Sequence, residues 1–185
     1  MSCGEIISSV VFSNMLNSKG LNATALNGAQ AGFKTNNDHT NAKILDMKCD
    51  RLLEELQSHD VVVVAGFQGV SKTGDMTTIG RGGSDTSAAA IGAAIRAEWI
   101  EIFTDVEGVM TADPRIVKDA KSLTVVTYNE ICNMAYQGAK VIHPRAVEIA
   151  MNAGIPLKVR STYSEAAGTL VTSLDKMNRT VDVKD

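Results

Sequence analysis

The spacing of apolar residues predicts helices and strands in the first third of the chain. Apolar residues at positions 6, 7, 10, 11, 15 and 16 predict a helix that ends at Lys19-Gly20. A short strand is predicted over 23–26, followed by a polar, glycine-containing loop over 27–41. A further strand over 43–47 precedes a helix that we expect Asp50 to cap, with leucines at 52, 53 and 56 on its apolar face.

The middle of the chain carries a continuous valine run that ends in glycine. Residues 61–65 read Val-Val-Val-Val-Ala, which predicts a central strand buried on both faces of a sheet. A glycine-rich loop follows it, then a helix over 85–97 with a face of small residues and a strand over 99–103. Ligands of open α/β sheets bind at the carboxyl ends of strands, so this order makes the loop a candidate site.

The last part of the chain contains local signals for helix ends. Residues 104–115 are rich in turn formers and acids. Thr127 and Glu130 form a capping-box pattern, and Pro144 fits the first turn of a helix that reaches about position 152. Strands are predicted over 156–159 and 169–171, before a polar tail. Strands that alternate with helices predict an α/β fold with a largely parallel sheet.

Composition narrows the class of protein. The 185 residues are 44% hydrophobic and 21% charged, as in ordinary globular domains. A net charge of −3 argues against a nucleic-acid surface, which is usually basic. Cys3, Cys49 and Cys132 lack the spacing of a disulfide framework or a zinc site. No stretch has the length of a membrane span or the pattern of a signal peptide, so we expect a soluble, cytoplasmic protein without membrane or nucleic-acid partners.

The glycine-rich loop has the chemistry of an anion site. Three glycines, Gly80, Gly82 and Gly83, surround Arg81, and Ser84-Asp85 opens the next helix. Glycine permits close approach of the backbone to a ligand, and the first N–H groups of a helix favour an anion. Arginine adds a planar fork for a carboxylate or phosphate. A solvated turn with Ser84 or Asp85 as helix cap is the alternative.

Seven motifs together identify a family resemblance. They are SCGE, NGAQAGF, VAGFQGV, TTIGRGGSDTSA, TDVEGVMTADPR, GAKVIHP and VRSTYSEAAGTLV, and they are distributed over 2–171, nearly all of which the similarity covers. In this order they closely resemble the aspartate kinases within the amino acid kinase family. The resemblance implies a three-layer αβα sandwich with a mostly parallel open sheet. Residues 1–174 would be part of the catalytic domain and 175–185 a polar tail, with no regulatory domain.

The resemblance also implies the reaction. An aspartate kinase transfers a phosphoryl group from MgATP to the side-chain carboxylate of L-aspartate, giving 4-phospho-L-aspartate in lysine, threonine and methionine biosynthesis. Such a transition state is loose and highly charged, so positioning and electrostatic stabilisation carry most of the catalysis. Mg²⁺ would be held mainly by nucleotide phosphates and water, and no metal held chiefly by the protein is expected.

Residue roles for aspartate and for catalysis follow by similarity. Arg81 would hold the α-carboxylate and Glu5 the ammonium, with Gly82, Gly83 and Ser84 completing the substrate loop. Lys140 would stabilise charge on the transferring phosphoryl group, and Asp85 would orient that lysine. Taken without the resemblance, Glu5 and Lys140 read as solvated charges and Asp85 as a helix cap.

Five further residues would bind the nucleotide together with Lys140. Thr104 and Asp105 lie where the family binds ATP beside a strand end. Asp113 and Arg115 would close over ATP, with Arg115 reaching its phosphates. Met110 stands where the family commonly has tyrosine, and it can pack there as an adaptable apolar side chain.

One departure from the family leaves alternatives open. Family members begin with a strand and a Lys-Phe-Gly-Gly type loop, which this sequence does not show. We therefore expect N-terminal strands to be missing and the chain alone to have little activity. A non-catalytic binding subunit and a sister kinase of this family are the other hypotheses. We also expect association into at least a dimer, and loops 80–85 and 104–115 on one rim of the sheet.

Overall fold

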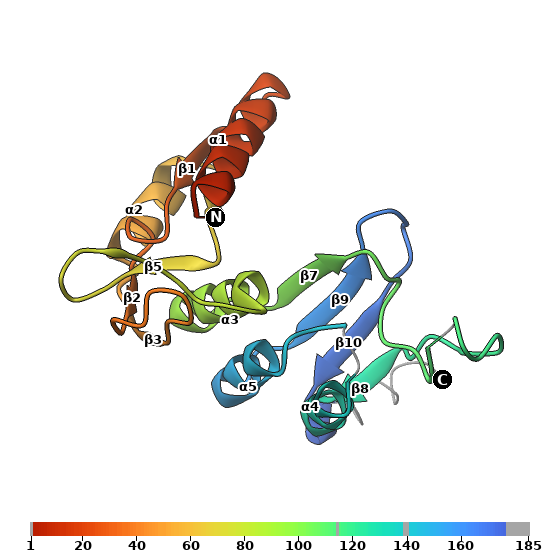
Figure 1. Cartoon of the computed structure of the whole chain (residues 1–185). Coiled ribbons are helices and arrows are strands. Elements are labelled where there is room, and N and C mark those ends of the chain that lie inside the picture. The colour runs from red at the N-terminus through yellow and green to blue at the C-terminus, as the bar shows by residue number, and fades with distance from the viewer. Residues whose placement is uncertain (1, 114, 139–140, 177–185) are drawn as a thin grey trace. The chain divides into compact units, whose positions relative to one another are not determined.

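The structure, a computed structural model, describes residues 2–113, 115–138 and 141–176. It consists of two compact units, residues 1–87 and residues 88–185. Both units contain helices and strands mixed along the chain (Figure 1), which confirms the predicted α/β class. The three-layer arrangement and the common rim stay predictions, because each unit is described by itself.

The first unit contains two sheets with their helices. Strands β1 and β4 form a two-stranded parallel sheet, and the second sheet has the order β3-β2-β5-β6. The elements in chain order are α1 (Ser2–Ser18), β1 (Ala23–Leu26), β2 (Phe33–Thr35), β3 (Ile44–Met47), α2 (Asp50–Ser58), β4 (Val61–Val64), β5 (Gln68–Val70) and β6 (Met76–Thr78). Helix α3 (Gly83–Ile95) begins here and continues into the second unit.

The predicted loop over 27–41 is partly wrong, because it contains β2. Phe33 is fully buried there, and Lys34 pairs with Val70 of β5 in parallel. The strands β5 and β6 were missed as well, and they form an antiparallel hairpin. Strands of three residues carry too few side chains to show a period, and their pairing partners lie far away in the sequence.

The prediction of a mostly parallel sheet needs correction, because the sheets are mixed. Strand β2 pairs antiparallel with β3 and parallel with β5, while β5 pairs antiparallel with β6. A parallel pair requires a crossover of about a dozen residues or more. The connections 36–43 and 71–75 are shorter than that, so these neighbours pair antiparallel.

Strand β4 is less buried than its valine run suggests. Each of its four valines is half-buried, against an expected burial on both faces. Among the described residues β4 hydrogen-bonds to one strand, β1, with Val61 in register with Ala23. A strand with one neighbour and with helices α1 and α2 packed near it keeps part of each side chain accessible.

Helix α1 confirms the first predicted helix, but its apolar residues are not the ones that pack inward. Its buried residues are Ser9 and Ser13, and the helix packs on β1 and β4. Ile7 and Val11 are 64% and 63% exposed. Periodicity therefore predicts the helix correctly, whereas small side chains decide which face lies close to the sheet.

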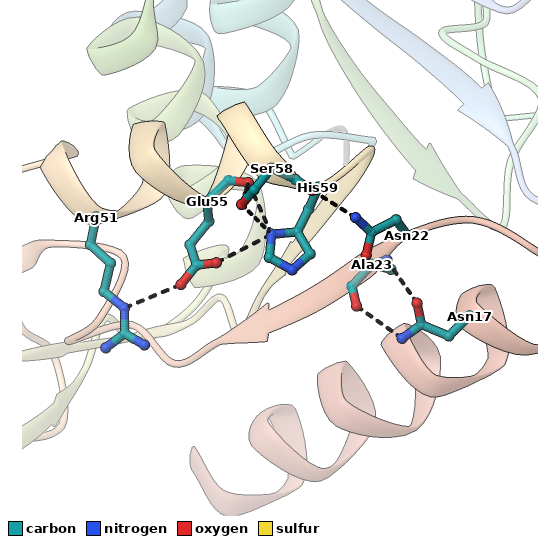
Figure 2. Close-up of polar contacts among 7 residues, drawn as sticks. All are labelled: Asn17, Asn22, Ala23, Arg51, Glu55, Ser58 and His59. Carbon is teal, nitrogen blue, oxygen red and sulfur yellow. Dashed lines mark hydrogen bonds and ion pairs between the residues drawn. The ribbon is translucent and has the colours of Figure 1, made fainter.

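A polar network joins the end of α2 to the start of β1 (Figure 2). The Asn22 side chain donates to the carbonyl oxygen of Ser58 at 2.6 Å, and the Asn22 N–H donates to Asp60 at 3.0 Å. Nδ1 of His59 lies 3.3 Å from Glu55, which also contacts Arg51. These contacts fix the turn that leads from α2 into β4.

The second unit is a four-stranded sheet covered by helices. Its sheet has the order β7-β9-β10-β8, with β9 and β10 antiparallel and the other neighbours parallel. Its further elements are β7 (Ile100–Thr104), β8 (Val125–Thr127), α4 (Tyr128–Tyr136), α5 (Pro144–Ala153), β9 (Leu157–Ser161) and β10 (Thr169–Thr172). The strands predicted over 99–103, 156–159 and 169–171 are confirmed within two residues, and β8 was missed.

The core of this unit lies between the sheet and helices α4 and α5. Leu157, Val159 and Val171 of the sheet pack with Ile131 and Val147 of the helices. The small-residue face of α3 also packs closely, since a Cβ at position 92 would lie 2.5 Å from the Ile100 side chain. The buried Tyr128 hydroxyl donates to the Ile155 carbonyl at 2.7 Å, and burial raises the pKa of this tyrosine.

Helix ends show which local predictions hold. The capping box is confirmed, because the Glu130 N–H donates to Thr127 Oγ1 and the Glu130 carboxylate accepts from the Thr127 N–H at 2.7 Å. The latter bond lowers the pKa of Glu130. Pro144 stands in the first turn of α5 as predicted. Asp50 is not a cap: the N-cap of α2 is Cys49, and Asp50 is the first helical residue.

Replacing Thr127 tests the capping box. We expect Thr127→Ala to lower the free energy of unfolding by about 1 kcal/mol, because it leaves a helix N–H without its acceptor. Urea denaturation monitored by circular dichroism measures this change. Thr124→Ala is the matched control, because Thr124 is exposed and its carbonyl contact with Leu170 survives. Equal effects of the two substitutions would contradict the role of the cap.

Candidate active site

A pocket of about 500 Å³ lies in the first unit, at the N-terminus of α3. It brings together all the residues that the resemblance assigns to the amino acid, along with Asp85. Its lining residues are Glu5, Phe67, Gly80, Arg81, Gly82, Gly83, Ser84 and Asp85. Glu5 comes from the first turn of α1, far from the loop in sequence.

The backbone of the loop requires glycine at three of its positions. Gly80 and Gly82 have φ +84° and +66°, in the left-handed region that L side chains rarely adopt. A Cβ at Gly83 would lie 2.6 Å from the Phe67 ring. The loop therefore packs directly on Phe67, and the Gly83 N–H closes the turn by donating to the Gly80 carbonyl at 3.1 Å.

The first turn of α3 is tied together by its own side chains. Thr86 Oγ1 donates to the Gly82 carbonyl at 2.7 Å, and Ser87 Oγ donates to the Gly83 carbonyl at 2.8 Å. Both hydroxyl groups are buried with their residues. Since the first N–H groups of a helix lack partners within it, this turn presents a partial positive charge to the pocket.

Phe67 is a site residue that the sequence reasoning missed. Its φ is +64°, which is uncommon outside glycine and costs about 1–2 kcal/mol. Its N–H donates to Ser87 Oγ at 2.9 Å and its carbonyl accepts from the Ile79 N–H at 3.0 Å. The signal available in the sequence was an aromatic residue in Gly-Phe-Gln-Gly, directly after an apolar strand.

Charges of both signs line the pocket. Arg81 is exposed, and Glu5 and Asp85 are half-buried. A guanidinium pairs with a carboxylate through two parallel hydrogen bonds, and a carboxylate pairs with an ammonium. The pocket can therefore bind a small zwitterion.

Thr104 and Asp105 lie at the carboxyl end of β7, in the second unit. Thr104 Oγ1 donates to the Asp105 carboxylate at 3.1 Å, and the Thr104 carbonyl accepts from the Thr162 N–H at 2.9 Å. These bonds fix the point at which the chain leaves the strand. Both side chains stand at a strand end, as the resemblance requires.

Met110 belongs to a short paired segment beyond this turn. It forms an isolated antiparallel bridge with Ser122. Thr111 and Lys121 extend the pairing, because the Thr111 N–H donates to the Lys121 carbonyl at 2.9 Å and Thr111 Oγ1 accepts from the Lys121 N–H at 3.0 Å. The bridge fixes the base of the loop that carries Asp113 and Arg115.

Asp113 and Arg115 form a clasp within that loop. Arg115 Nε and Nη2 donate to the two carboxylate oxygens of Asp113 at 3.0 and 2.8 Å. The Arg115 side chain is 87% exposed. Hydrogen bonds from Arg115 lower the pKa of Asp113 from 3.8 to about 2, and the same contact raises the pKa of Arg115.

Two further predictions concern metal and membrane. Among the described residues, no group of three or more His, Cys, Asp or Glu side chains is placed to hold a metal ion. In that same part of the chain, every helix is too short or too polar to cross a membrane. Lys140 lies outside the described residues, so its predicted contact with Asp85 stays a prediction.

Comparison with known proteins decides the family. The family described as "Amino acid kinase family" matches residues 1–161. The chain belongs to the amino acid kinase family. Membership agrees with an α/β fold that places a glycine loop at the start of a helix.

Individual relatives narrow the resemblance. Aspartokinase 1 of Bacillus subtilis (strain 168) is 71% identical over 173 residues, which are 94% of this chain and 43% of that protein. The chain thus spans less than half the length of this curated relative. The crystal structure of E. coli aspartokinase III with aspartate and ADP has a TM-score of 0.84 at 34% identity, covering 92% of this chain and 39% of that one.

A further solved structure agrees with this relation. The aspartate kinase from Synechocystis has a TM-score of 0.80 and 45% identity, covering 93% of this chain and 28% of that chain. These matches confirm the α/β fold, with mixed sheets. They do not support the expectation that N-terminal strands are missing.

The clasp gives a direct prediction about pH. The Asp113 carboxyl should titrate near 2, so the ion pair is complete above the ordinary pKa of 3.8 and is lost as the pH falls through about 2. Arg115→Gln should return the pKa of Asp113 toward 3.8, because its main hydrogen-bond donors are gone. Carboxyl ¹³C NMR titration measures both values.

Lys118→Gln is the matched control, since it removes an exposed positive charge from the same loop and leaves the clasp intact. If Asp113 titrated near 3.8 in the unmodified protein, the clasp would not exist in solution.

Proposed function

We propose that this chain supplies the site for phosphoryl transfer from MgATP to the side-chain carboxylate of L-aspartate, giving 4-phospho-L-aspartate. The observation that carries the proposal is the pocket in which Glu5 and Arg81 meet the N-terminus of α3. The 71% identity to a protein named aspartokinase supports it. So does the similarity to an aspartokinase crystallised with aspartate and ADP.

Aspartate is recognised by its two charged α-groups. Arg81 pairs with the α-carboxylate, and Glu5 pairs with the ammonium. Gly82, Gly83 and Ser84 complete the substrate loop at the positive end of α3. A pocket lined by both charges favours a zwitterion over a simple anion.

Catalysis rests on two residues near the reacting groups. Lys140 places its ammonium against the phosphoryl group, where negative charge develops during transfer. Asp85 accepts from Lys140 and orients it. Its place at the first turn of α3, beside Arg81, suits this role.

The nucleotide is held by residues of the second unit together with Lys140. Thr104 and Asp105 stand at the end of β7, and Met110 packs beside the nucleotide. Arg115 binds the phosphates. Two hydrogen bonds to Asp113 hold the planar guanidinium of Arg115 in a fixed orientation. Mg²⁺ would be held mainly by the nucleotide phosphates and water.

Several wider assignments follow from this reaction. The substrates are small metabolites of lysine, threonine and methionine biosynthesis, so the proposed location is the cytoplasm. Residues 1–174 form part of the catalytic domain of a longer protein. The chain covers 43% of the length of the Bacillus relative, as a portion of a longer enzyme would.

Arg81→Ala tests the proposed function. The assay uses the longest natural protein that contains this chain, and hydroxylamine traps the acyl phosphate formed from MgATP and L-aspartate. Loss of a charged hydrogen-bonding contact that is equal in ground and transition states should raise the KM for aspartate about 10- to 100-fold and change kcat little. Arg51→Ala is the control, because Arg51 lies on the surface of α2 and its ion-pair partner among the described residues is Glu55.

Three results would contradict the proposal. Product from glutamate in place of aspartate would favour a sister kinase. Aspartate binding without any acyl phosphate would favour a non-catalytic binding protein. A fall in kcat at unchanged KM would show that Arg81 does not bind the α-carboxylate of aspartate.

We also propose that two copies associate through α1. Its outward row includes Ile7, Val10 and Val11, which are all exposed, and Glu5 is the only charged residue among Ser2–Ser18. Two such helices can pack side by side without like charges in contact. Exposed apolar rows of this kind mark interaction sites more often than random surface.

Val11→Glu tests this association. It should shift the protein from dimer toward monomer, because the dimer would bury two new charges. Sedimentation velocity over a range of concentrations measures the change. Leu45→Glu is the control, since Leu45 is 68% exposed on β3 and lies outside the α1 row. A monomeric unmodified protein at high concentration would overturn the proposal.

A further inference from the structure

Hydrophobic packing alone does not fix helix α1 tightly on its sheet. The side chains that it buries fully are those of Ser9 and Ser13, which offer little apolar surface, while Ile6 and Leu16 are only half-buried. Ser9 Oγ donates to the Ile6 carbonyl of its own helix, so it does not tie the helix to a strand. The position of α1 therefore depends strongly on the polar contacts at its two ends.

The C-terminal end of α1 is held by Asn17. The Asn17 carboxamide donates to the Ala23 carbonyl at 2.9 Å and accepts from the Ala23 N–H at 2.8 Å (Figure 2). These two hydrogen bonds fix the last turn of the helix to the first residue of β1. It lies at the opposite end of the helix from Glu5.

The N-terminal end is held by Gln68, the first residue of β5. Gln68 is 1% exposed, and its Nε2 donates to the Ser2 carbonyl at 3.1 Å. Ser2 belongs to the same first turn of α1 as Glu5. Residue 67, directly before Gln68, lines the pocket together with Glu5.

The Gln68 side chain has little freedom to move. A Cβ at Gly28 would lie 2.8 Å from Gln68 Cγ, so the stem of the glutamine fills the space that Gly28 leaves. A side chain wedged in this way transmits the position of β5 to the first turn of α1.

The other end of the amide is not satisfied. Among the described residues, Gln68 Oε1 is buried and has no hydrogen-bond partner. An unpaired buried carbonyl is unfavourable, and an apolar side chain of similar shape avoids this cost. Gln68 thus does not serve stability well, which indicates that its donor group serves the pocket.

We propose that Gln68 is a positioning residue that sets the Glu5 carboxylate for the ammonium of the substrate. It acts through the Ser2 carbonyl and the first turn of α1, and it does not touch the substrate. The identity of the ligand rests on the proposed function. The role of Gln68 separates recognition of the ammonium from recognition of the carboxylate, which belongs to Arg81.

Gln68→Met is the first test, measured by isothermal titration with L-aspartate and with succinate, which lacks the ammonium. The affinity for aspartate should fall about tenfold, the scale of one charged contact, and the affinity for succinate should stay the same. Hydrogen exchange should rise in the first turn of α1. The thermal midpoint should not fall, because methionine removes the unpaired carbonyl.

Asn17→Ala is the matched control at the other end of α1. It should raise hydrogen exchange in the last turn and lower the thermal midpoint, while the preference for aspartate over succinate stays as in the unmodified protein. A merely structural role for Gln68 would give the same pattern as Asn17.

A second variant guards against a folding defect. Gln68→Asn keeps the carboxamide but shortens the stem, so it cannot reach Ser2. It should lose the same preference for aspartate. In combination with Glu5→Gln, Gln68→Met should add no further loss, since both act on one contact.

Two outcomes are decisive. If both variants at position 68 keep the aspartate preference of the unmodified protein, the inference is wrong and the proposed function stands. If the unmodified protein binds aspartate and succinate equally, Glu5 does not read the ammonium, and the inference fails together with that part of the proposed function.

Discussion

The backbone at Phe67 is the constraint on which the pocket depends. Its left-handed conformation is held by a bond to Ser87 of α3 and a bond from Ile79. The ring then lies where any side chain at position 83 would collide with it. One strained residue therefore sets the distance between strand, loop and helix, and the strain of about 1–2 kcal/mol is offset by bonds on both sides of its peptide unit.

Local chemistry was readable from the sequence wherever it acts within about four residues. Thr127 and Glu130 form hydrogen bonds with each other, and the ring of Pro144 suits the first turn of a helix. The capping box and the start of α5 were therefore predicted correctly. The elements missed depend on distant partners. Strand β2 exists because β3 and β5 flank it, and the half-burial of β4 reflects how many neighbours it has.

The candidate site shows the same division. The residue types of Arg81 and its neighbouring glycines indicate an anion site without any structural information. That Glu5 reaches the same pocket followed from the family resemblance and not from any pattern in the chain. Phe67 was missed because nothing in its side chain predicts a positive φ. The inward serines of α1 were missed for a related reason, since periodicity locates a helix face but does not say which face a sheet accepts.

In the Asp113–Arg115 clasp, the Asp113 carboxylate competes with a ligand phosphate for the Arg115 guanidinium. A phosphate that pairs with the Nε and Nη2 edge of Arg115 must displace a carboxylate already held there through two hydrogen bonds. The net gain is then the difference between two similar ion pairs, and charge alone gives little advantage. Selection among ligands then depends on shape. A ligand binds favourably only if it accepts hydrogen bonds from both Nε and Nη2 of Arg115 and also leaves the displaced Asp113 well solvated.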